Sequence, residues 1–379
     1  MKNNKLLNKK IVICICTFDL GGAERQAILL ANELKTKYNL EIELWALGSE
    51  KGNGLDFINK FDLKVKSLNL KFWDEGEKEI TNKKIAFELD SNNIDIIIPF
   101  TYWPNLYCCS VWKKTKAEVC LWNQRDVGYG IKVNKEEQSA LNNSSAIVSN
   151  STSGLKFLTD NFQIDRTKLN LIYNGLYYEE PELNKFELKK KLGLEKYKFV
   201  CIMVANINER KDHKTLIKAW SNFIQHSKKK VDSILMILGK KSETYHEVSQ
   251  LVEQLGISDS VIVLDFVQNV PEYLKISDVA ILSSISEGLP NVIMEYMAAG
   301  LPVIATNLGG CRELLGEKYP LFFDTGDYIK LSNLITTLKK NLIKRIFYSV
   351  RNKLRIRGNF SIDLMTGEYM KLINSFSEK

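Results

Sequence analysis

The chain has no long apolar run. None of its 379 residues belongs to a stretch approaching the roughly 20 apolar residues that a membrane-spanning helix requires. Residues 1–10 are basic, but the apolar segment after them, residues 11–16, is too short for the hydrophobic region of a secretory signal peptide. We therefore expect a cytoplasmic protein without a membrane-spanning helix.

Metal-ligand patterns are also scarce. The sequence has no Asp-x-Asp pair of the kind that often holds a divalent cation, and its three histidines, His213, His226 and His246, are far apart on expected helices. The seven cysteines include no paired C-x-x-C spacing, so reduced thiols are the simplest interpretation. We expect no metal site and no bound cofactor.

Charged residues are plentiful, with a modest excess of basic over acidic ones. The net charge is +8, and 45% hydrophobic with 26% charged residues suit a globular chain of two domains. No basic stripe with interleaved aromatic residues is present, which argues against a nucleic-acid partner. The apolar residues 106–112, followed by Lys113, Lys114 and Lys116, could meet anionic lipid at a membrane surface, although a helix packed on a sheet explains them slightly better.

One segment of the second half combines a buried strand, a turn and a short helix. Residues 279–282 are apolar and predict the strand. Gly288 permits a tight turn, and Pro290 suits the first turn of a helix that Gly300 and Pro302 then end. This helix would begin just beyond the carboxyl end of a strand, where its unpaired N–H groups and its dipole favour an anion such as a diphosphate.

Two carboxylates flank this turn. Glu295 lies four residues after Asn291, about one turn into the helix, so its side chain can reach the same region as Glu287. A carboxylate repels phosphate, and both groups are better suited to accept hydrogen bonds from the hydroxyls of a ribose or a sugar ring. The alternative is that Glu287 complements the helix dipole while Glu295 faces solvent.

The spacing of Glu287 and Glu295, with Gly288-Leu289-Pro290 between them, resembles the E-x7-E signature of the retaining glycosyltransferases of family 4, which have the GT-B fold. Further segments resemble that family in the expected order along nearly the whole chain. They are Gly21-Gly22-Ala23-Glu24-Arg25, Asn150-Ser151, Ile172-Tyr173-Asn174-Gly175, Val204-Ala205-Asn206-Ile207 through Lys211-Asp212-His213, and Gly309-Gly310 with Glu313. So many fragments in register leave little room for coincidence.

Strands and helices alternate twice along the chain, which predicts an α/β fold of two Rossmann-like, doubly wound domains. Strands are expected at residues 11–16, 41–47, 94–100, 146–148, 199–205, 234–238 and 261–264. The GT-B resemblance implies an acceptor-side domain at residues 1–178, a donor domain at residues 179–360, and a C-terminal helix, residues 361–379, that packs back on the first domain. Ligands would bind beyond the carboxyl ends of the strands, in a cleft between the domains.

The resemblance also implies how the leaving diphosphate is bound. Arg210 and Lys211 follow the strand at residues 199–205, where two cations could stabilise the growing negative charge. Lys211 matches the family pattern, whereas the family's arginine stands a few positions earlier, where this chain has Asn206 and Asn208. Arg210 therefore either replaces that arginine or points elsewhere.

The first domain departs from the family in one place. Many relatives carry a histidine near the reacting sugar, but no histidine precedes His213 in this chain. The expected counterpart is Asn123-Gln124-Arg125-Asp126, in which Arg125 would bind the donor or an acceptor phosphate and Asp126 would orient it. A surface Arg–Asp pair at the end of a strand explains these two residues equally well.

Base recognition would involve the loop at residues 265–269, although Phe266 is as easily explained as a core residue. Glu287 would hold hydroxyls of the donor sugar without acting as a nucleophile, and Glu295 would hold the ribose. The expected catalytic residues are Glu287, Lys211, Arg210 and Arg125. The expected donor-binding residues are Gly21, Gly22, Asn206, Val267, Gly288, Leu289, Pro290, Asn291 and Glu295.

The resemblance implies a retaining glycosyltransferase, and the missing metal-ligand patterns predict that it works without a metal ion. The resemblance implies a nucleoside diphosphate donor, with a UDP-sugar favoured and GDP-mannose next. It also implies a lipid-linked glycan acceptor in surface polysaccharide assembly, at the inner face of the cell membrane. Two alternatives stay open: a GT-B sugar-nucleotide epimerase, and a non-catalytic donor-binding regulatory subunit. The shifted arginine and the missing histidine motivate the second, whereas Glu287, Lys211 and Glu295 argue against it.

Overall fold

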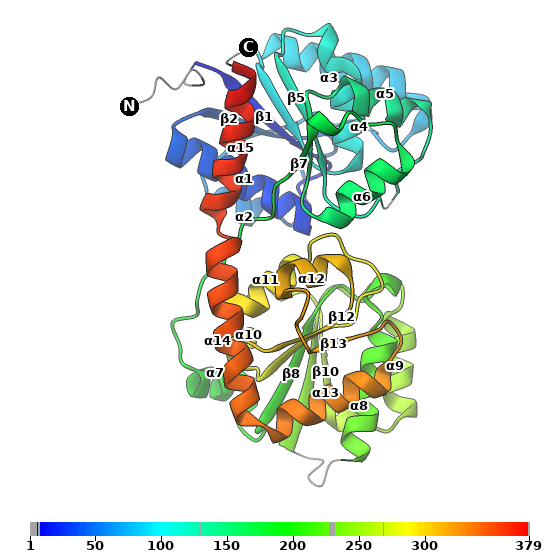
Figure 1. Ribbon diagram of the computed structural model, residues 1–379, viewed down its shortest axis with the longest axis vertical. Helices are drawn as coiled ribbons and strands as arrows, with labels where there is room; N and C mark the ends of the chain where they lie inside the picture. Colours follow the sequence, from blue (N-terminus) through cyan, green and yellow to red (C-terminus); the bar gives the residue numbers. More distant parts are fainter. Residues whose placement is uncertain (1–5, 7, 129, 227–231, 268, 378–379) are drawn as a thin grey trace. The chain divides into compact units, whose positions relative to one another are not determined.

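The computed structural model describes residues 6, 8–128, 130–226, 232–267 and 269–377. The chain divides into two compact units, unit 1 (Met1–Gly175 with Phe360–Lys379) and unit 2 (Leu176–Asn359) (Figure 1). The sequence places the corresponding boundaries after residue 178 and at residue 361. Gln268, a member of the expected base-binding loop, lies outside the described residues.

Unit 1 contains a sheet of seven parallel strands in the order β3-β2-β1-β4-β5-β6-β7. The strands are β1 (Lys10–Ile15), β2 (Glu41–Ala46), β3 (Lys64–Ser67), β4 (Ile96–Pro99), β5 (Val119–Gln124), β6 (Ala146–Ser149) and β7 (Leu169–Leu171). The helices are α1 (Gly22–Tyr38), α2 (Leu55–Asn59), α3 (Lys78–Ser91), α4 (Tyr102–Val111), α5 (Lys135–Asn143), α6 (Thr152–Asn161) and α15 (Ile362–Ser377), with 3-10 turns η1 (Glu75–Glu77), η2 (Trp112–Lys114) and η3 (Arg166–Lys168).

Both faces of this sheet are buried. Alternate residues of β1 enter two different cores, because successive side chains of a strand point to opposite faces. Ile13 belongs to a core that includes Tyr369 of α15, and Cys14 belongs to a core that includes Cys108 of α4. Helices α1 and α15 lie side by side, so the C-terminal helix is part of unit 1 (Figure 1).

Unit 2 contains a second parallel sheet, of six strands, in the order β10-β9-β8-β11-β12-β13. The strands are β8 (Phe199–Val204), β9 (Ser233–Leu238), β10 (Val261–Leu264), β11 (Val279–Leu282), β12 (Val303–Thr306) and β13 (Phe322–Phe323). The helices are α7 (Lys185–Lys191), α8 (His213–Gln225), α9 (Tyr245–Gln254), α10 (Val270–Ile276), α11 (Asn291–Ala298), α12 (Gly309–Leu315), α13 (Tyr328–Lys340) and α14 (Leu342–Asn359), with 3-10 turns η4 (Glu209–Lys211) and η6 (Ser258–Ser260).

The prediction of two Rossmann-like α/β domains is confirmed by these two sheets. The hypothesis that residues 106–112 meet a membrane is wrong. Leu106, Tyr107 and Val111 of α4 are at most 3% exposed and form part of the core of unit 1. Within the described residues, no helix is both long and apolar enough to cross a membrane.

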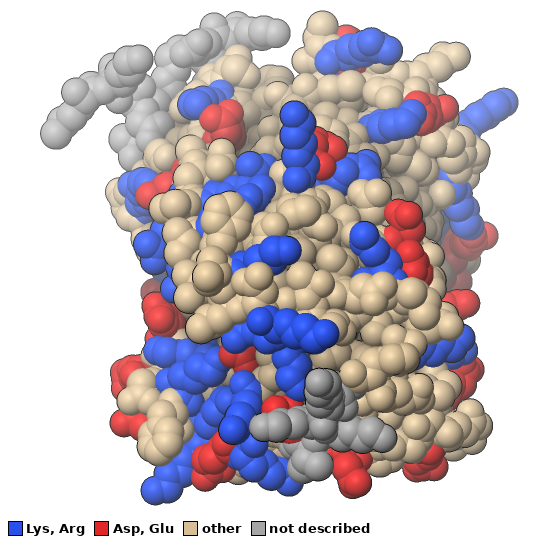
Figure 2. Space-filling model, turned by 60° about the horizontal axis from the view of Figure 1, so that its bottom comes forward, with Lys and Arg blue, Asp and Glu red and all other residues tan. Residues whose placement is uncertain are grey.

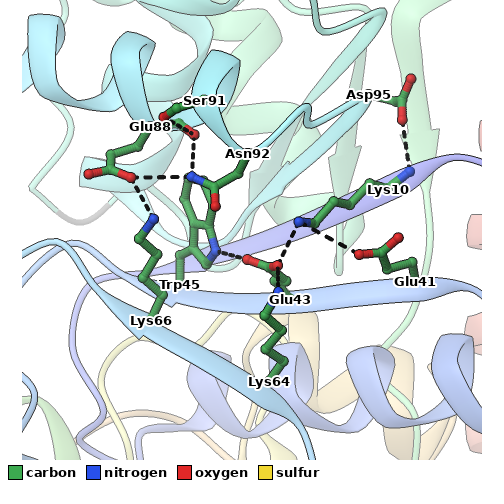
Figure 3. A network of polar contacts seen from close by, with 10 residues as sticks. All are labelled: Lys10, Glu41, Glu43, Trp45, Lys64, Lys66, Glu88, Ser91, Asn92 and Asp95. Atoms are coloured by element: carbon green, nitrogen blue, oxygen red, sulfur yellow. Dashed lines mark hydrogen bonds and ion pairs between the residues drawn. The ribbon is translucent and has the colours of Figure 1, made fainter.

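An ion-pair network around the buried Glu43 joins the first three strands of unit 1 (Figure 3). Glu43, whose side chain is 2% exposed, lies on β2 directly opposite Lys64 of β3. Its Oε1 is 2.7 Å from Lys10 Nζ and also pairs with Lys64, while Trp45 Nε1 donates to Oε2 at 2.7 Å. Burial alone would raise the pKa of Glu43, but these three hydrogen bonds outweigh it and lower the pKa to about 2.

We expect Glu43→Gln to lower the free energy of unfolding by about 2–3 kcal/mol at pH 7, because it leaves two lysines without their shared carboxylate. A depressed folded-state pKa stabilises the fold above the unfolded value of 4.5, and this stabilisation is lost as the pH falls toward about 2. In urea unfolding, the difference in stability between variant and parent should therefore shrink as the pH falls from about 5 toward 2. The control is Glu41→Gln on the same strand, whose side chain is 64% exposed and should contribute less than about 0.5 kcal/mol. A pH-independent loss would contradict the ion-pair explanation.

Candidate active site

In unit 2 the candidate site lies at the carboxyl edge of the sheet, where the loops that follow β8 and β11 meet. The strand order runs from β8 through β9 to β10 in one direction and from β11 through β12 to β13 in the other. The order therefore reverses between β8 and β11. Open parallel α/β sheets bind their ligands at such a switch point.

Two of the predicted residues meet there. Lys211 ends η4, which follows β8, and Glu287 lies in the turn after β11. Glu287 Oε1 is 2.5 Å from Lys211 Nζ and accepts a second hydrogen bond from Ser284 Oγ at 2.6 Å. The two charged side chains are only 22% and 12% exposed. A partly shielded pair of this kind interacts more strongly than a pair on the surface.

The backbone around this pair is held by hydrogen bonds between the two loops. Ile285 N donates to the carbonyl of Arg210 at 2.7 Å, and Ser283 Oγ lies within 3.1 Å of the carbonyls of Lys211 and Asp212. Asp212 has a φ of 45°, and its carboxylate caps α8 by accepting from Thr215 N. The direction of the Lys211 side chain is thus set from β11 as well as from its own loop.

The sequence analysis did not predict the two serines that support the site, Ser283 and Ser284. Thr306 Oγ1, at the end of β12, donates to the carbonyl of Ser284 at 2.8 Å, so three adjacent strand ends are tied together. The available signal was the position of Ser283 and Ser284. They are two small polar residues directly after an apolar strand, where a parallel sheet places its functional groups.

The backbone of the turn before α11 lies so close to α12 that α12 requires a glycine there. A Cβ on Gly310, in α12, would lie 1.5 Å from the carbonyl oxygen of Gly288. Gly288, Leu289 and Pro290 are buried, and Pro290 is the N-cap of α11 rather than part of its first turn. The side chain of Pro290 makes no capping hydrogen bond, and the first residue of the helix is Asn291. Backbone N–H groups at such an end are suited to an anion.

Glu295 lies on α11, half-buried, one turn after Asn291. Burial raises the pKa of Tyr178, and the charges of Glu180 and Glu295 raise it further, which places the Glu295 carboxylate within electrostatic reach of Tyr178. The next residue, Tyr296, is fully buried and accepts from Val204 N at 2.7 Å. This hydrogen bond fixes α11 to the end of β8, and so fixes the position of Glu295 relative to the Lys211 loop.

The other predicted donor-site residues of unit 2 lie along the same edge. Asn206 is exposed, and its Oδ1 accepts from Lys240 N, just after β9, at 3.2 Å. Arg210 is exposed on η4, and Val267 is half-buried after β10. Phe266 is 59% exposed, so its interpretation as a core residue is wrong.

His213, at the start of α8, is 2% exposed and follows the loop of the charged pair. Burial, and then the charge of Lys211, lower its pKa to about 4. His213 is therefore neutral at pH 7 and does not add a positive charge to the site.

Unit 1 has its own switch point, between β1 and β4. Gly21 and Gly22 are exposed where α1 begins, and Gly21 is its N-cap. A Cβ on Gly21 would lie 2.4 Å from the Glu24 carboxylate, which folds back over this turn. Thr101, after β4, has a φ of 71°, an uncommon value for a residue with a side chain, and contacts Cys16 Sγ through its hydroxyl at 3.2 Å.

Arg125, at the end of β5, is not part of a surface pair, so that interpretation is wrong. Its guanidinium lies 4.9 Å from the centroid of the Phe100 ring, and Nη2 donates to Asn174 Oδ1. Its Nε and Nη1 are buried and have no hydrogen-bond partner among the described residues, although the Tyr369 hydroxyl lies close enough to interact with the guanidinium. Burial lowers the pKa of Arg125, although Tyr369 and Glu24 oppose this shift. A guanidinium with two buried nitrogens of this kind is suited to an anionic or polar ligand.

Comparison with known proteins shows which proteins this chain resembles. Residues 184–353, most of unit 2, match the family model described as glycosyl transferases group 1. UDP-Gal:alpha-D-GlcNAc-diphosphoundecaprenol alpha-1,3-galactosyltransferase of Escherichia coli is 28% identical over 197 residues, which are 50% of each chain. N-acetylgalactosamine-N,N'-diacetylbacillosaminyl-diphospho-undecaprenol 4-alpha-N-acetylgalactosaminyltransferase of Campylobacter jejuni is 29% identical over 175 residues, which are 45% of this chain and 44% of that one. The chain thus spans half or less of these curated relatives.

Solved structures match over almost the whole chain. HepE of Anabaena, solved with UDP and glucose, has a TM-score of 0.84 at 18% identity and covers 97% of this chain and 100% of its own. WaaG, a glycosyltransferase of lipopolysaccharide biosynthesis, has a TM-score of 0.73 at 14% identity, with 96% and 99% coverage. At these identities the match defines the fold, which is the GT-B fold of glycosyltransferases.

Proposed function

We propose that the chain is a retaining glycosyltransferase of family 4 that transfers a sugar from a nucleoside diphosphate to a lipid-linked glycan. The observation that carries this proposal is the Lys211–Glu287 pair at the switch point between β8 and β11. The pair lies within the segment that matches the glycosyltransferase model. A cation and a carboxylate at one strand edge suit a ligand with a phosphate end and a hydroxyl-rich end.

In this proposal the diphosphate is bound without a metal ion. Lys211, with Arg210 from the same turn, faces the oxygens that become negative when the bond to the sugar breaks. The N–H groups at the start of α11 and the positive end of its helix dipole supply further attraction for the diphosphate. Asn206 and the backbone near Val267 would contact the nucleoside.

The carboxylates act on hydroxyl groups. Both contacts of Glu287 use Oε1, which leaves Oε2 to accept from hydroxyls of the donor sugar. Glu295, one turn into α11, holds the ribose. The acceptor attacks the sugar on the same face that the diphosphate leaves, and the departing phosphate takes up the acceptor's proton. The configuration is then retained, and no covalent sugar intermediate is required.

The acceptor groups belong to unit 1. Nε and Nη1 of Arg125 are suited to a phosphate of the acceptor. The exposed turn at Gly21 and Gly22, which we assign to the donor, allows close approach of that ligand to the backbone. The two curated relatives above act, by name, on sugars attached to diphospho-undecaprenol. A diphosphate-linked lipid acceptor at a membrane surface is therefore the class of substrate we propose.

The test is thermal unfolding of the full chain with UDP-, GDP- and ADP-sugars in the presence of EDTA. A ligand that binds only the folded protein raises Tm, and we expect a UDP-sugar to do so at a concentration well above its Kd. Glu295→Gln should reduce this shift without changing the Tm of the unliganded protein. A shift that appears only after addition of a divalent cation would contradict metal-independent binding. A shift with donor turnover but no transfer to any lipid-linked acceptor would favour the epimerase, and no shift with any donor would overturn the proposal.

A further inference from the structure

Helix α14 presents an unpartnered apolar stripe to solvent. Its five members are each more than half exposed and recur at the three- and four-residue spacing that places side chains on one side of a helix. They are Ile343 (80%), Ile346 (54%), Phe347 (60%), Val350 (53%) and Leu354 (69%). The opposite side of α14, with Asn352 and Ile356, is fully buried in unit 2. The stripe is thus additional to the face that packs α14 onto its own unit.

Basic residues border this stripe. Between Asp327 and Asp363 the sequence has no acidic residue and nine basic ones, namely Lys330, Lys339, Lys340, Lys344, Arg345, Arg351, Lys353, Arg355 and Arg357. At about 100° per residue, Lys344 and Lys353 fall on opposite borders of the stripe, and Arg357 continues its line beyond Leu354. On the face of the molecule drawn in Figure 2, blue Lys and Arg side chains are more prominent than red ones.

Some of these cations have structural tasks. Arg351 Nη2 donates to the carbonyl of Leu315 at 2.7 Å, and Arg355 Nε donates to the carbonyl of Leu314 at 2.6 Å. Both tie α14 to the end of α12. Lys344 and Arg357 are exposed, and a helix without acidic side chains offers them no carboxylate of its own.

We propose that α14 docks the protein on a membrane surface that contains anionic lipid, with the apolar stripe among the headgroups. A helix with one apolar face, basic borders and no acidic residue has the signature of an interfacial helix, and its cations are attracted to anionic headgroups. A second copy of this chain fits less well, because two facing α14 helices would bring their basic borders together. The docking goes beyond the proposed function, and it is measured without any donor or acceptor.

Helix α3 also carries two exposed apolar residues, but the charges near them differ from those near the stripe of α14. Ile80 and Phe87 on α3 are 59% and 64% exposed and seven residues apart. However, Glu75, Glu77 and Glu79 lie at the start of that region, so an anionic surface would be repelled there. Phe87 therefore supplies the matched control, since it is an equally exposed aromatic residue on an exposed helix.

The experiment is cosedimentation of the full chain with vesicles of phosphatidylcholine alone or with about 30% phosphatidylglycerol. We expect binding to the anionic vesicles only, weakened by added salt. The variant Ile343→Ser/Phe347→Ser should lower the partition coefficient at least about tenfold, because it removes two of the five apolar side chains. The variant Lys344→Gln/Lys353→Gln should lower it by about fivefold per charge, and Phe87→Ser should leave it unchanged.

The experiment distinguishes membrane docking by α14 from the competing explanations. Equal binding of the parent and Ile343→Ser/Phe347→Ser, or equal binding to both kinds of vesicle, would overturn the proposal. The proposal would also be overturned if the parent does not bind vesicles and is a dimer by light scattering while the variant Ile343→Ser/Phe347→Ser is a monomer. The stripe would then be a contact between copies of the chain. Ile343, Lys344, Phe347 and Phe87 are exposed, whereas Lys353 is half-buried beside Gly300. An unchanged Tm and an unchanged donor-induced Tm shift therefore separate failure of docking from misfolding and from failure of the donor site.

Discussion

Replacement of Lys211 by Ala is expected to lower kcat by about 10²–10³-fold in a protein that still folds. The diphosphate gains negative charge as it leaves the sugar, and Lys211 is a cation held at the switch point by its pairing with Glu287. Removal of one donor to such a developing charge costs about 3–4 kcal/mol in other enzymes. The substitution also leaves Glu287, whose side chain is 12% exposed, with the hydroxyl of Ser284 but without its cation.

The matched control for this variant is Lys214→Ala. Lys214 lies on α8 just after the same loop, and its side chain is 53% exposed and pairs with the equally exposed Glu247. Its removal should change kcat and Tm little, because exposed pairs contribute about 0–1 kcal/mol. Steady-state kinetics with varied donor would measure both variants, and Lys211→Arg should restore part of the rate. Equal losses in Lys211→Ala and Lys214→Ala, or an unchanged kcat in folded Lys211→Ala, would remove Lys211 from the mechanism.

The fold could be predicted from the sequence because buried parallel strands are continuous apolar runs. Residues 199–204 and 279–282 are such runs, and both are strands of the second sheet. Short edge strands were not predicted: β13 is only two residues long, Phe322–Phe323, and β3 contains two lysines. An edge strand pairs on one side only, so its sequence carries a weaker hydrophobic pattern.

Glu287 and Lys211 could also be predicted as site residues, because each follows a strand that the sequence pattern indicates. Their mutual contact could not be predicted, since it depends on β8 and β11 being neighbours although they are distant in sequence. The burial of Arg125 depends similarly on Phe100 and Asn174, which come from two other strand ends of unit 1. Local patterns indicate which residues stand at strand ends, and the order of the strands decides which of them meet.

Burial was the property that the sequence predicted least well. Residues 106–116 and residues 343–354 both combine apolar and basic residues, yet the apolar residues 106–109 and 111 are buried in α4, whereas α14 presents its stripe to solvent. Periodicity identifies an apolar face but not whether another element covers it. A helix in which both faces carry apolar residues, as in α14, can bury only one of them in its own unit.

Replacement of Glu287 by Gln is expected to lower kcat by about 10²–10³-fold without raising the KM for the donor. The amide keeps the size of the side chain and can still accept from Ser284, but it loses the negative charge that supports the positive sugar ring in the transition state. Lys211 also loses its carboxylate partner and becomes a better ligand for the diphosphate. Donor binding should therefore be unchanged or tighter while turnover falls.

This separation of kcat from KM distinguishes a role in the transition state from a structural one. The exposed Glu317, whose side chain is 74% exposed, provides the control Glu317→Gln, which should have parental kinetics. Because Glu287 and Lys211 act as one unit, the double variant Lys211→Ala/Glu287→Gln should lose much less than the product of the two single losses. Strictly multiplicative losses would show that the two side chains act independently. A raised KM with parental kcat in Glu287→Gln would mean that the carboxylate binds the donor equally well before and during the reaction, contrary to the assigned role.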